Sequence, residues 1–307
     1  KIFDGFFLSQ KQMPNIKTLC RNKKDYDRET KQDIFKINKN TNPGLHPFIK
    51  AREYQRALVA TKLDKIFAKP FVGALTGHSD AISCFAKSLK SLTNFISGCY
   101  DGEVRFWDIS TKKTVFNLNA HTGIVKGLTF SYDGLHFASC GSENQANLYR
   151  VQDCIDNYKN PEFQPLKKYQ SKSHLTGIDH HYGEDKFVTS GQVVQVWSYE
   201  RSQPLQSFEW GADSVTRARF NPSEQNLIAA VALDRSIALY DLRGGTPIKK
   251  NFLMNKSTSV CWNPMEPVMF TVSNEDSNCY TFDMRKLDIA KTIHKDHILA
   301  VMDIDYA

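Results

Sequence analysis

The 307-residue sequence contains no long hydrophobic run, and none of its apolar stretches approaches the roughly 20 residues that a membrane-spanning helix needs. It also contains no Cys-x-x-Cys pair, no glycine-rich loop of the kind that holds phosphates, and no pair of carboxylates that stands out as catalytic. We therefore expect no membrane, no small-molecule substrate, and no catalytic, cofactor-binding or metal-binding residue. The protein is predicted not to be an enzyme.

Cysteine usage indicates a reduced, intracellular protein. The seven cysteines are odd in number. Four of them, Cys84, Cys99, Cys261 and Cys279, fall inside strand patterns, where a thiol serves as a small apolar side chain. The apolar cluster within residues 1–12 is too short for a secretory signal and lacks its flanking residues.

Positive charge is concentrated at the start of the chain. Residues 1–70 contain 16 Lys and Arg against 7 Asp and Glu, whereas residues 71–307 contain 24 against 26, so the surplus of nine lies wholly in the first part. We expect residues 1–70 to form a basic arm that is extended from about residue 17 to 40, because few apolar groups are present there. Such an arm is drawn to anionic partners such as RNA phosphates, the alternative being a solvated tail.

A helix is predicted from about Lys50 to the residue before Pro70, since the prolines at 43 and 47 keep the preceding segment extended. Its apolar residues change sides near Thr61, which favours either a break there or a helix held from two sides. The alternative is a helix that contacts only the rest of this chain. The candidate partner-binding residues of the arm are His46, Phe48, Tyr54, Leu63 and Phe67.

A turn pair, Asp101-Gly102, lies between two short apolar segments and predicts a β-hairpin that ends in Trp107-Asp108. Aromatic residues recur at the corresponding position, at 107, 149, 197, 240 and 282, with spacings of 42, 48, 43 and 42 residues. A period of roughly 40 to 45 residues with a terminal Trp-Asp is typical of β-propeller blades.

The first repeat, from Gly77-His78 to Trp107-Asp108, resembles the WD-repeat family. That resemblance implies an all-β propeller, in which His78, Ser97, Asp101 and Trp107 form a buried, hydrogen-bonded tetrad with a structural role. Residues 71–307 then provide about five blades and the first strand of a sixth, whereas the family has seven. We expect the chain to be a fragment, with the predicted strands at 71–75 and 300–306 left as unpaired edges.

Two features of the repeats remain open. The segment from Gln152 to Gln170 is a long, proline-interrupted connection, which is either functional or a plain surface excursion. The pair His180-His181 lacks further ligands at metal-binding spacing, so a metal site is not predicted.

Short sequence segments, some of them outside the generic repeat, make the chain similar to the SOF family of WD-repeat proteins from about residue 17 onward. They are residues 46–48, 52–54, 60–63, 67–71, 176–181, 210–211, 261–266 and 274–276. The resemblance implies a scaffold of the nucleus and nucleolus: a component of the small-subunit processome, associated with the box C/D small nucleolar RNA particle and required for pre-rRNA processing. The implied partners are processome proteins, pre-rRNA and that particle.

A second function is implied by the same resemblance, because animal members are described as substrate receptors of a cullin-RING ubiquitin ligase. Such receptors carry Trp-Asp-x-Arg at the ends of two consecutive blades. The matching residues are Asp241 and Arg243, and Asp283 and Arg285, which are the candidate contacts of a ligase adaptor. The alternative is that they are ordinary repeat residues that pair locally.

Overall fold

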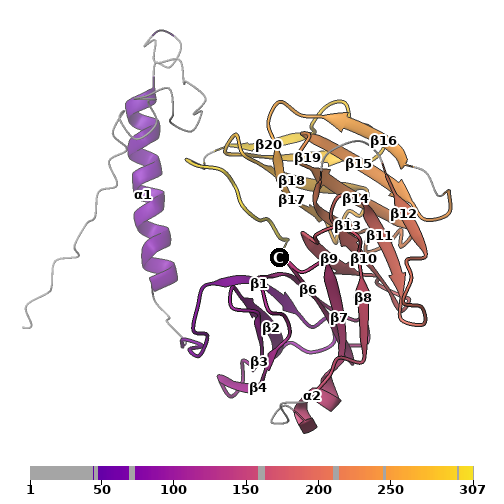
Figure 1. Ribbon diagram of the computed structural model, residues 1–307. Coiled ribbons are helices and arrows are strands. Elements are labelled where there is room, and N and C mark those ends of the chain that lie inside the picture. The colour runs from indigo at the N-terminus through magenta and orange to yellow at the C-terminus, as the bar shows by residue number, and fades with distance from the viewer. Residues whose placement is uncertain are drawn as a thin grey trace, which may run out of the picture. The chain divides into compact units, whose positions relative to one another are not determined.

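The computed structural model describes residue 44 and residues 48–68, 73–157, 163–209, 214–244, 247–295 and 297–306. The chain divides into two compact units, Lys1–Gly73 and Ala74–Ala307. The first unit contains helix α1 (Ile49–Ala68), and the second contains all the described strands together with helix α2 (Val151–Asn157) (Figure 1).

Helix α1 is continuous, so of the two alternatives for the change of sides near Thr61, the break is wrong. The Thr61 hydroxyl donates to the Ala57 carbonyl oxygen at 2.9 Å, which keeps this polar side chain within the helix. No proline or glycine lies between residues 49 and 68, and the segment is rich in good helix formers. Large apolar side chains on several sides of α1 are exposed: Tyr54, Leu58, Val59 and Leu63.

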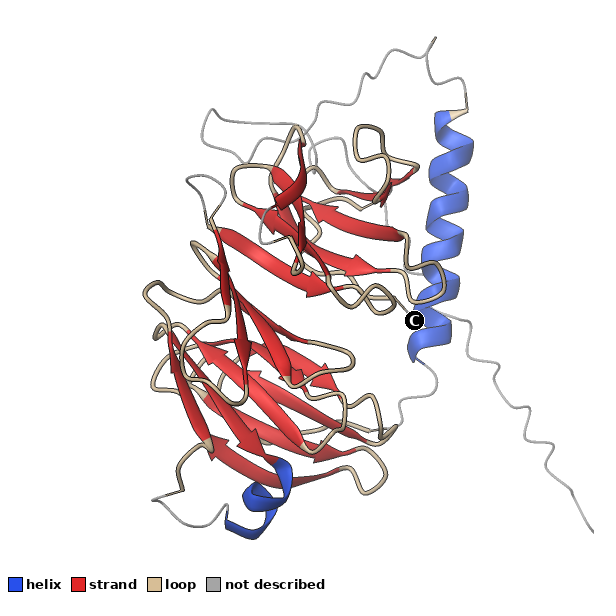
Figure 2. Cartoon of the chain, turned by 90° about the vertical axis from the view of Figure 1, so that its right-hand side faces the viewer, coloured by secondary structure: helices blue, strands red, loops and turns tan. Residues whose placement is uncertain are grey.

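In its described residues, the second unit contains five four-stranded antiparallel sheets, each with its strands in chain order, so the predicted all-β propeller architecture is confirmed (Figure 2). The first two sheets comprise β1 (Ile82–Lys87), β2 (Asn94–Cys99), β3 (Glu103–Asp108) and β4 (Lys113–Asn119), then β5 (Val125–Phe130), β6 (His136–Gly141), β7 (Gln145–Arg150) and β8 (Lys167–Gln170). The third comprises β9 (Gly177–His180), β10 (Lys186–Ser190), β11 (Val194–Ser198) and β12 (Gln206–Phe208). The last two comprise β13 (Val215–Phe220), β14 (Leu227–Ala232), β15 (Ser236–Asp241) and β16 (Pro247–Phe252), then β17 (Ser257–Trp262), β18 (Met269–Asn274), β19 (Asn278–Asp283) and β20 (Thr292–Lys295). We call these sheets blades one to five.

The blades pack face to face, with the first strand of each blade, β1, β5, β9, β13 and β17, against the first strand of the next. Figure 1 shows β1, β9, β13 and β17 around the middle of the unit, near the C-terminal end of the chain. The core lies between neighbouring blades. Between blades one and two, the rings of Phe106 and Phe116 stack with their centres 5.0 Å apart, and Phe130 of blade two contacts Phe106 edge-on. This burial of aromatic surface is the main favourable term for blade association.

The hairpin turn between the second and third strands has the same conformation in four blades. Gly102 has φ 88°, and the residues in its place in blades two, four and five, Asn144, Arg235 and Ser277, have φ 58°, 70° and 68°. At Gly102 a side chain is excluded as well, since an added Cβ would lie 2.0 Å from the His121 carbonyl oxygen. The Asp-Gly turn predicted from sequence is therefore present.

In the described residues of the two predicted edge strands, no strand is formed. Gly73–Leu75 is irregular, and the preceding residues 71 and 72 lie outside the described part. Residues 300–306 also form no strand, because within the described part a single backbone bond, from the Val301 amide to the Asn274 carbonyl oxygen, joins them to a sheet. The long connection after β7 begins as α2, whose buried Cys154 packs into the core between blades one and two.

Candidate functional site

The two Asp-x-Arg segments lie at the ends of β15 and β19, at equivalent positions in consecutive blades. Each aspartate accepts the backbone amide of the arginine two residues later: Arg243 N to Asp241 Oδ1 and Arg285 N to Asp283 Oδ1, both at 2.9 Å. This local bond closes a tight turn and fixes where each arginine leaves the blade. The sequence pattern thus produces the same turn twice.

The two arginine side chains are held differently. Arg285 makes a close pair with Asp283, at 2.8 Å between Nη2 and Oδ2 and 3.1 Å between Nε and Oδ1, and this guanidinium lowers the pKa of Asp283 to about 2. Arg243 is paired more loosely, with 3.8 Å between Nε and Asp241 Oδ1 and 3.8 Å between Nη2 and Glu224 Oε2. Both arginine side chains are about two-thirds exposed, at 66% and 70%, so a partner can reach them.

The preceding blade supports each of these turns. From β12, Gln206 Nε2 donates to the Leu242 carbonyl oxygen at 2.8 Å, and from β16, Lys249 Nζ donates to the Arg285 carbonyl oxygen at 2.7 Å. Lys167 of β8 does the same to Tyr199 at 2.8 Å. The orientation of each turn therefore depends on two blades.

A hollow of about 340 Å³ lies beside Arg243, between blades three and four. Its lining is partly apolar, with Val196, Leu205 and Leu242, and partly polar, with Lys186, Gln206, Asn226 and Arg243. Such a shape can accept an apolar side chain from a partner that also contacts the arginine.

The predicted tetrad of blade one is brought together, with one difference. Ser97 Oγ lies 2.6 Å from His78 Nε2 and 2.7 Å from Trp107 Nε1, and its side chain and that of the tryptophan are 3% exposed. Asp101 instead accepts the Ser79 hydroxyl and the Glu103 amide, and is not hydrogen-bonded to His78. The Ser79 contact is the main reason that the pKa of Asp101 falls to about 2.

Glu103 is a partner of His78 that the motif did not reveal. Its carboxylate lies 3.4 Å from His78 Nδ1 and 2.8 Å from Arg105 Nη2. Burial nevertheless dominates at His78 and lowers its pKa, so the ring is neutral near pH 7. The alternation of Glu103 and Arg105 was the available signal, because side chains two residues apart on a strand lie on the same face, where opposite charges can pair.

Sequence reasoning also missed a set of hydroxyl groups in or beside the first strands of the blades, three of which bond to the first strand of the next blade and one to residue 301. Ser83 donates to the Val125 carbonyl oxygen, Thr176 to Val215 at 2.6 Å, Thr216 to Ser257 at 3.3 Å, and Thr258 to Val301. Ser83, Thr216 and Thr258 each occupy a β-bulge, which turns the side chain toward the next blade. The spacing of 40 and 42 residues between the threonines was visible in the sequence.

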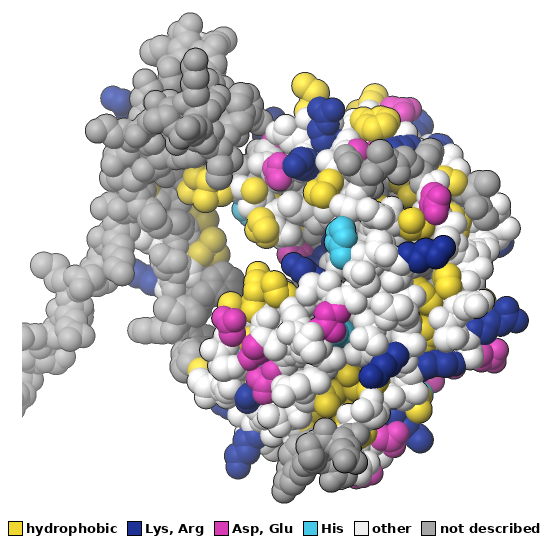
Figure 3. Space-filling view, in the orientation of Figure 1, with side chains coloured by type: hydrophobic (Ala, Val, Ile, Leu, Met, Phe, Trp, Pro, Cys, Tyr) yellow, Lys and Arg dark blue, Asp and Glu magenta, His cyan; other side chains and the backbone are white. Residues whose placement is uncertain are grey.

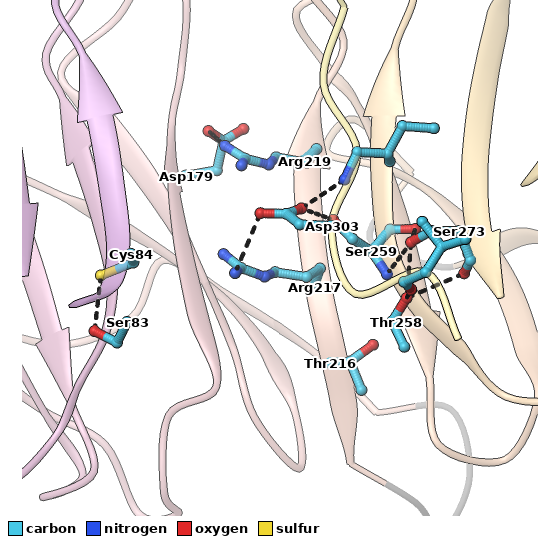
Figure 4. A network of polar contacts seen from close by, with 12 residues as sticks. Ser83, Cys84, Asp179, Thr216, Arg217, Arg219, Thr258, Ser259, Ser273 and Asp303 are labelled. Carbon is cyan, nitrogen blue, oxygen red and sulfur yellow. Dashed lines mark hydrogen bonds and ion pairs between the residues drawn. The ribbon is translucent and has the colours of Figure 1, made fainter. Parts of the chain in front are cut away.

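Figure 4 shows the charged side chains near these hydroxyls. Arg219 Nη1 lies 3.0 Å from the buried Asp179, and Arg217 Nη2 lies 4.0 Å from Asp303. Asp303 also accepts the Ser259 hydroxyl at 2.6 Å. Residues 300–306 therefore contact β17 as the first strand of a further blade would, although no strand is formed.

The histidine pair serves as hydrogen-bonding groups. His180 lies 2.6 Å from the His181 carbonyl oxygen through Nδ1 and 2.8 Å from the Tyr199 hydroxyl through Nε2. His181 Nδ1 accepts the amides of Gly183 and Glu184. Burial lowers the pKa of both rings. In the described ranges no group of three His, Cys, Asp or Glu side chains is arranged to hold a metal.

The candidate residues of the arm are only partly described. Phe48 (73% exposed), Tyr54 (69%) and Leu63 (45%) are open to solvent. His46 and the side chain of Phe67 lie outside the described residues. Neither described helix combines the length and apolar character needed to cross a bilayer. On the visible face of the second unit, acidic and basic side chains are interspersed (Figure 3), which fits its near-balanced charge.

The family model "WD domain, G-beta repeat" matches residues 69–108 and 112–150. The chain is 46% identical to DDB1- and CUL4-associated factor 13 of Danio rerio and 43% identical to the protein of that name in Homo sapiens, in each case over 95% of this chain and 65% of the relative. It is 35% identical to Protein SOF1 of Saccharomyces cerevisiae, over 95% of this chain and 64% of the relative.

The chain is a WD-repeat protein that matches the SOF family. The match confirms the resemblance found from sequence segments in the arm and in the repeats. The chain spans just under two-thirds of the length of these relatives. WD-repeat scaffolds and adaptors are generally not enzymes, and in this chain the His78, Ser97 and Asp101 side chains are engaged in structural hydrogen bonds.

Proposed function

We propose that the chain belongs to a scaffold protein of ribosome biogenesis, a component of the nucleolar small-subunit processome that is required for pre-rRNA processing and maturation of the small-subunit rRNA. The observation that carries the proposal is the match to the SOF family, at 35% identity to Protein SOF1 over 95% of the chain. A propeller of stacked blades supports it, because such a fold offers several faces to different proteins. The protein acts by binding and not by catalysis.

The basic arm supplies the contact with pre-rRNA or the small nucleolar RNA particle in this proposal. Its surplus of nine positive charges is sufficient for salt-dependent binding to phosphates, whereas residues 71–307 carry a net charge of −2. The candidate arm residues His46, Phe48, Tyr54, Leu63 and Phe67 contact processome proteins. The exposure of Phe48, Tyr54 and Leu63 in the described part supports that role.

Depletion of the protein from the nucleus of cells that make it tests the proposal. Uncleaved pre-rRNA should accumulate and mature small-subunit rRNA should fall, while the large-subunit rRNA stays constant. Northern hybridisation with probes for both subunits measures this. Unchanged processing after depletion of the protein contradicts the proposal.

The second candidate function is that of a substrate receptor for a cullin-RING ubiquitin ligase. Two observations favour it: relatives at 43–46% identity are named DDB1- and CUL4-associated factor 13, and the turns at Asp241-Arg243 and Asp283-Arg285 share one geometry with exposed arginines. We propose these four residues as the adaptor contact.

Charge reversal tests the second function. Arg243→Glu with Arg285→Glu should abolish co-purification of a DDB1-type adaptor and leave folding intact, since exposed charges typically change stability by less than about 0.5 kcal/mol. The matched control is Arg235→Glu with Lys256→Glu, which makes the same charge change in the same two blades at the opposite ends of the strands. Equal adaptor recovery from both variants would remove the motif from consideration.

A further inference from the structure

Five large apolar side chains are exposed at one end of blades one and two. They come from the β1–β2 loop, the β3–β4 turn and the β5–β6 turn: Leu89 (53% exposed), Leu92 (99%), Ile109 (48%), Tyr132 (42%) and Leu135 (56%). We call them the loop patch. A single exposed leucine needs no explanation, but a cluster of this kind on a soluble domain commonly marks an interaction site.

Contacts between the loops hold the patch together. The Ile109 amide donates to the Thr93 carbonyl oxygen at 2.9 Å, which joins the β3–β4 turn to the β1–β2 loop. The Lys90 ammonium lies 4.7 Å from the centre of the Tyr132 ring, which joins blade one to blade two by a cation–π contact. Gly134 also packs against the β1–β2 loop, since an added Cβ would lie 3.2 Å from Ser88 Oγ.

The corresponding loops of the later blades are different. Residues 221–226 of blade four form a polar turn capped by Asn221, and residues 263–268 of blade five place one exposed apolar side chain, Met265 (88%), at the tip. In the described parts of the later blades, Leu205 (38%) of the β11–β12 connection and Ile289 (80%) of the β19–β20 connection are also exposed, so what distinguishes blades one and two is the clustering of five such side chains. Met265 provides a reference position that is exposed and lies outside the loop patch.

The border of the patch is basic. Lys90, Lys113 and Arg150 are exposed around it, whereas the nearby Asp108 is engaged by the hydroxyls of its own turn, with Ser110 Oγ at 2.7 Å. Asp133 is the acidic side chain within the three connections, and Asp153 and Asp156 follow Arg150 in α2. The chain's own arm carries a surplus of nine positive charges, so it is electrostatically unsuited to this border.

We propose that the loop patch is a docking surface for an acidic segment of a partner protein that carries several large apolar side chains. The apolar side chains of the segment cover Leu89, Leu92 and Leu135, and its carboxylates face Lys90, Lys113 and Arg150. A single-stranded RNA fits less well, because four of the five patch side chains are aliphatic and cannot stack on bases. This surface is separate from the Asp-x-Arg turns of blades four and five.

The probe is a fluorescein-labelled 16-residue amphipathic peptide with leucines on one helical face and glutamates on the other, titrated with the 307-residue protein in a fluorescence anisotropy assay. We expect saturable binding. Leu92→Ser with Leu135→Ser should weaken binding at least about tenfold, because it removes two leucine side chains that the bound peptide would bury. Lys90→Glu with Lys113→Glu should weaken binding at least as much and flatten its salt dependence.

Controls make the outcome decisive. Met265→Ser should leave affinity within about twofold, since a truncation outside the contact is near neutral, and all variants should melt at the wild-type temperature because the changed side chains are exposed. The proposal is overturned by no saturable binding of the glutamate peptide, by equal binding of a lysine counterpart, or by an equal effect of Met265→Ser. It is also overturned if the serine substitutions abolish self-association in light scattering, or if oligouridine occupies the patch in place of the peptide.

Discussion

Replacing His181 with asparagine isolates one source of acid sensitivity in the propeller. His181 is 2% exposed, and its Nδ1 accepts the amides of Gly183 at 3.1 Å and Glu184 at 2.9 Å. In the next blade Asn221 Oδ1 accepts the amides of residues 223 and 224 in the same way, and in blade five Asn263 Oδ1 does so for residues 265 and 266. Asparagine therefore retains the turn and removes the titrating ring.

The magnitude follows from proton linkage. Burial lowers the pKa of folded His181, so as pH falls below about 6.5 the unfolded chain binds a proton that the folded chain does not, and stability is lost. A ring that stays neutral in the folded state costs at most about 1.4 kcal/mol between pH 7.5 and pH 5.5. At pH 7.5 the substitution itself should cost about 1 kcal/mol, because the edge-on contact of His181 with Phe220, at 5.1 Å between ring centres, is lost.

Urea unfolding followed by tryptophan fluorescence at pH 7.5, 6.5 and 5.5 measures both effects. The free energy of unfolding of His181→Asn should fall less steeply with acid than that of the wild type, by up to the linkage value. The control is His174→Asn, an exposed position, which should keep the wild-type pH dependence. Identical pH dependence of His181→Asn and wild type would refute the assignment of a proton-free, acceptor role to Nδ1.

Two further predictions concern the tetrad and the arm. Ser97→Ala should lower the free energy of unfolding by about 2–4 kcal/mol in the same assay, because it leaves the ring nitrogens of His78 and Trp107 without their partner, whereas the exposed Ser110→Ala should change it by less than about 0.5 kcal/mol. If Ser97→Ala lowers the free energy of unfolding by no more than Ser110→Ala does, the tetrad has no structural role. Deleting residues 1–47, which carry 10 Lys and Arg, should flatten the salt dependence of RNA binding measured by filter retention, and an unchanged slope would place the RNA contact elsewhere.

The repeat pattern allowed the architecture to be predicted from sequence. Turn residues such as Asp101-Gly102 and the aromatic that ends each third strand are short-range signals, and they placed the hairpins correctly. The five aromatic positions also fixed the number of complete blades. These short-range signals are sufficient because each blade is a meander, in which strands that follow one another in sequence pair with one another.

Contacts between blades were not predictable in the same way. The bond from Lys249 to the Arg285 carbonyl oxygen joins positions 36 residues apart, and the pair of Asp179 with Arg219 joins positions 40 apart. Neither residue in such a pair stands out by type, so only the three-dimensional register of adjacent sheets brings them together. Residues 73–75 of the strand predicted at 71–75 are irregular for a related reason, since an apolar run forms a strand only where a neighbouring edge accepts its hydrogen bonds.

Because the proposed adaptor contact is supported by the preceding blade, it should be sensitive to a residue that does not belong to it. Lys249→Met removes the donor to the Arg285 carbonyl oxygen and leaves both arginines in place. Losing one such bond should weaken adaptor binding by about two- to tenfold, as expected for a net contribution of about 0.5–1.5 kcal/mol. Lys249→Arg keeps a donor and should restore most of the affinity, while Lys256→Met, an exposed lysine at the other end of the blades, should have no effect. Calorimetric titration of the adaptor with these three variants separates the possibilities: if Lys249→Met binds like Lys256→Met, the turn holds its orientation without blade four, and if Lys249→Arg fails to restore binding, Lys249 itself contacts the partner.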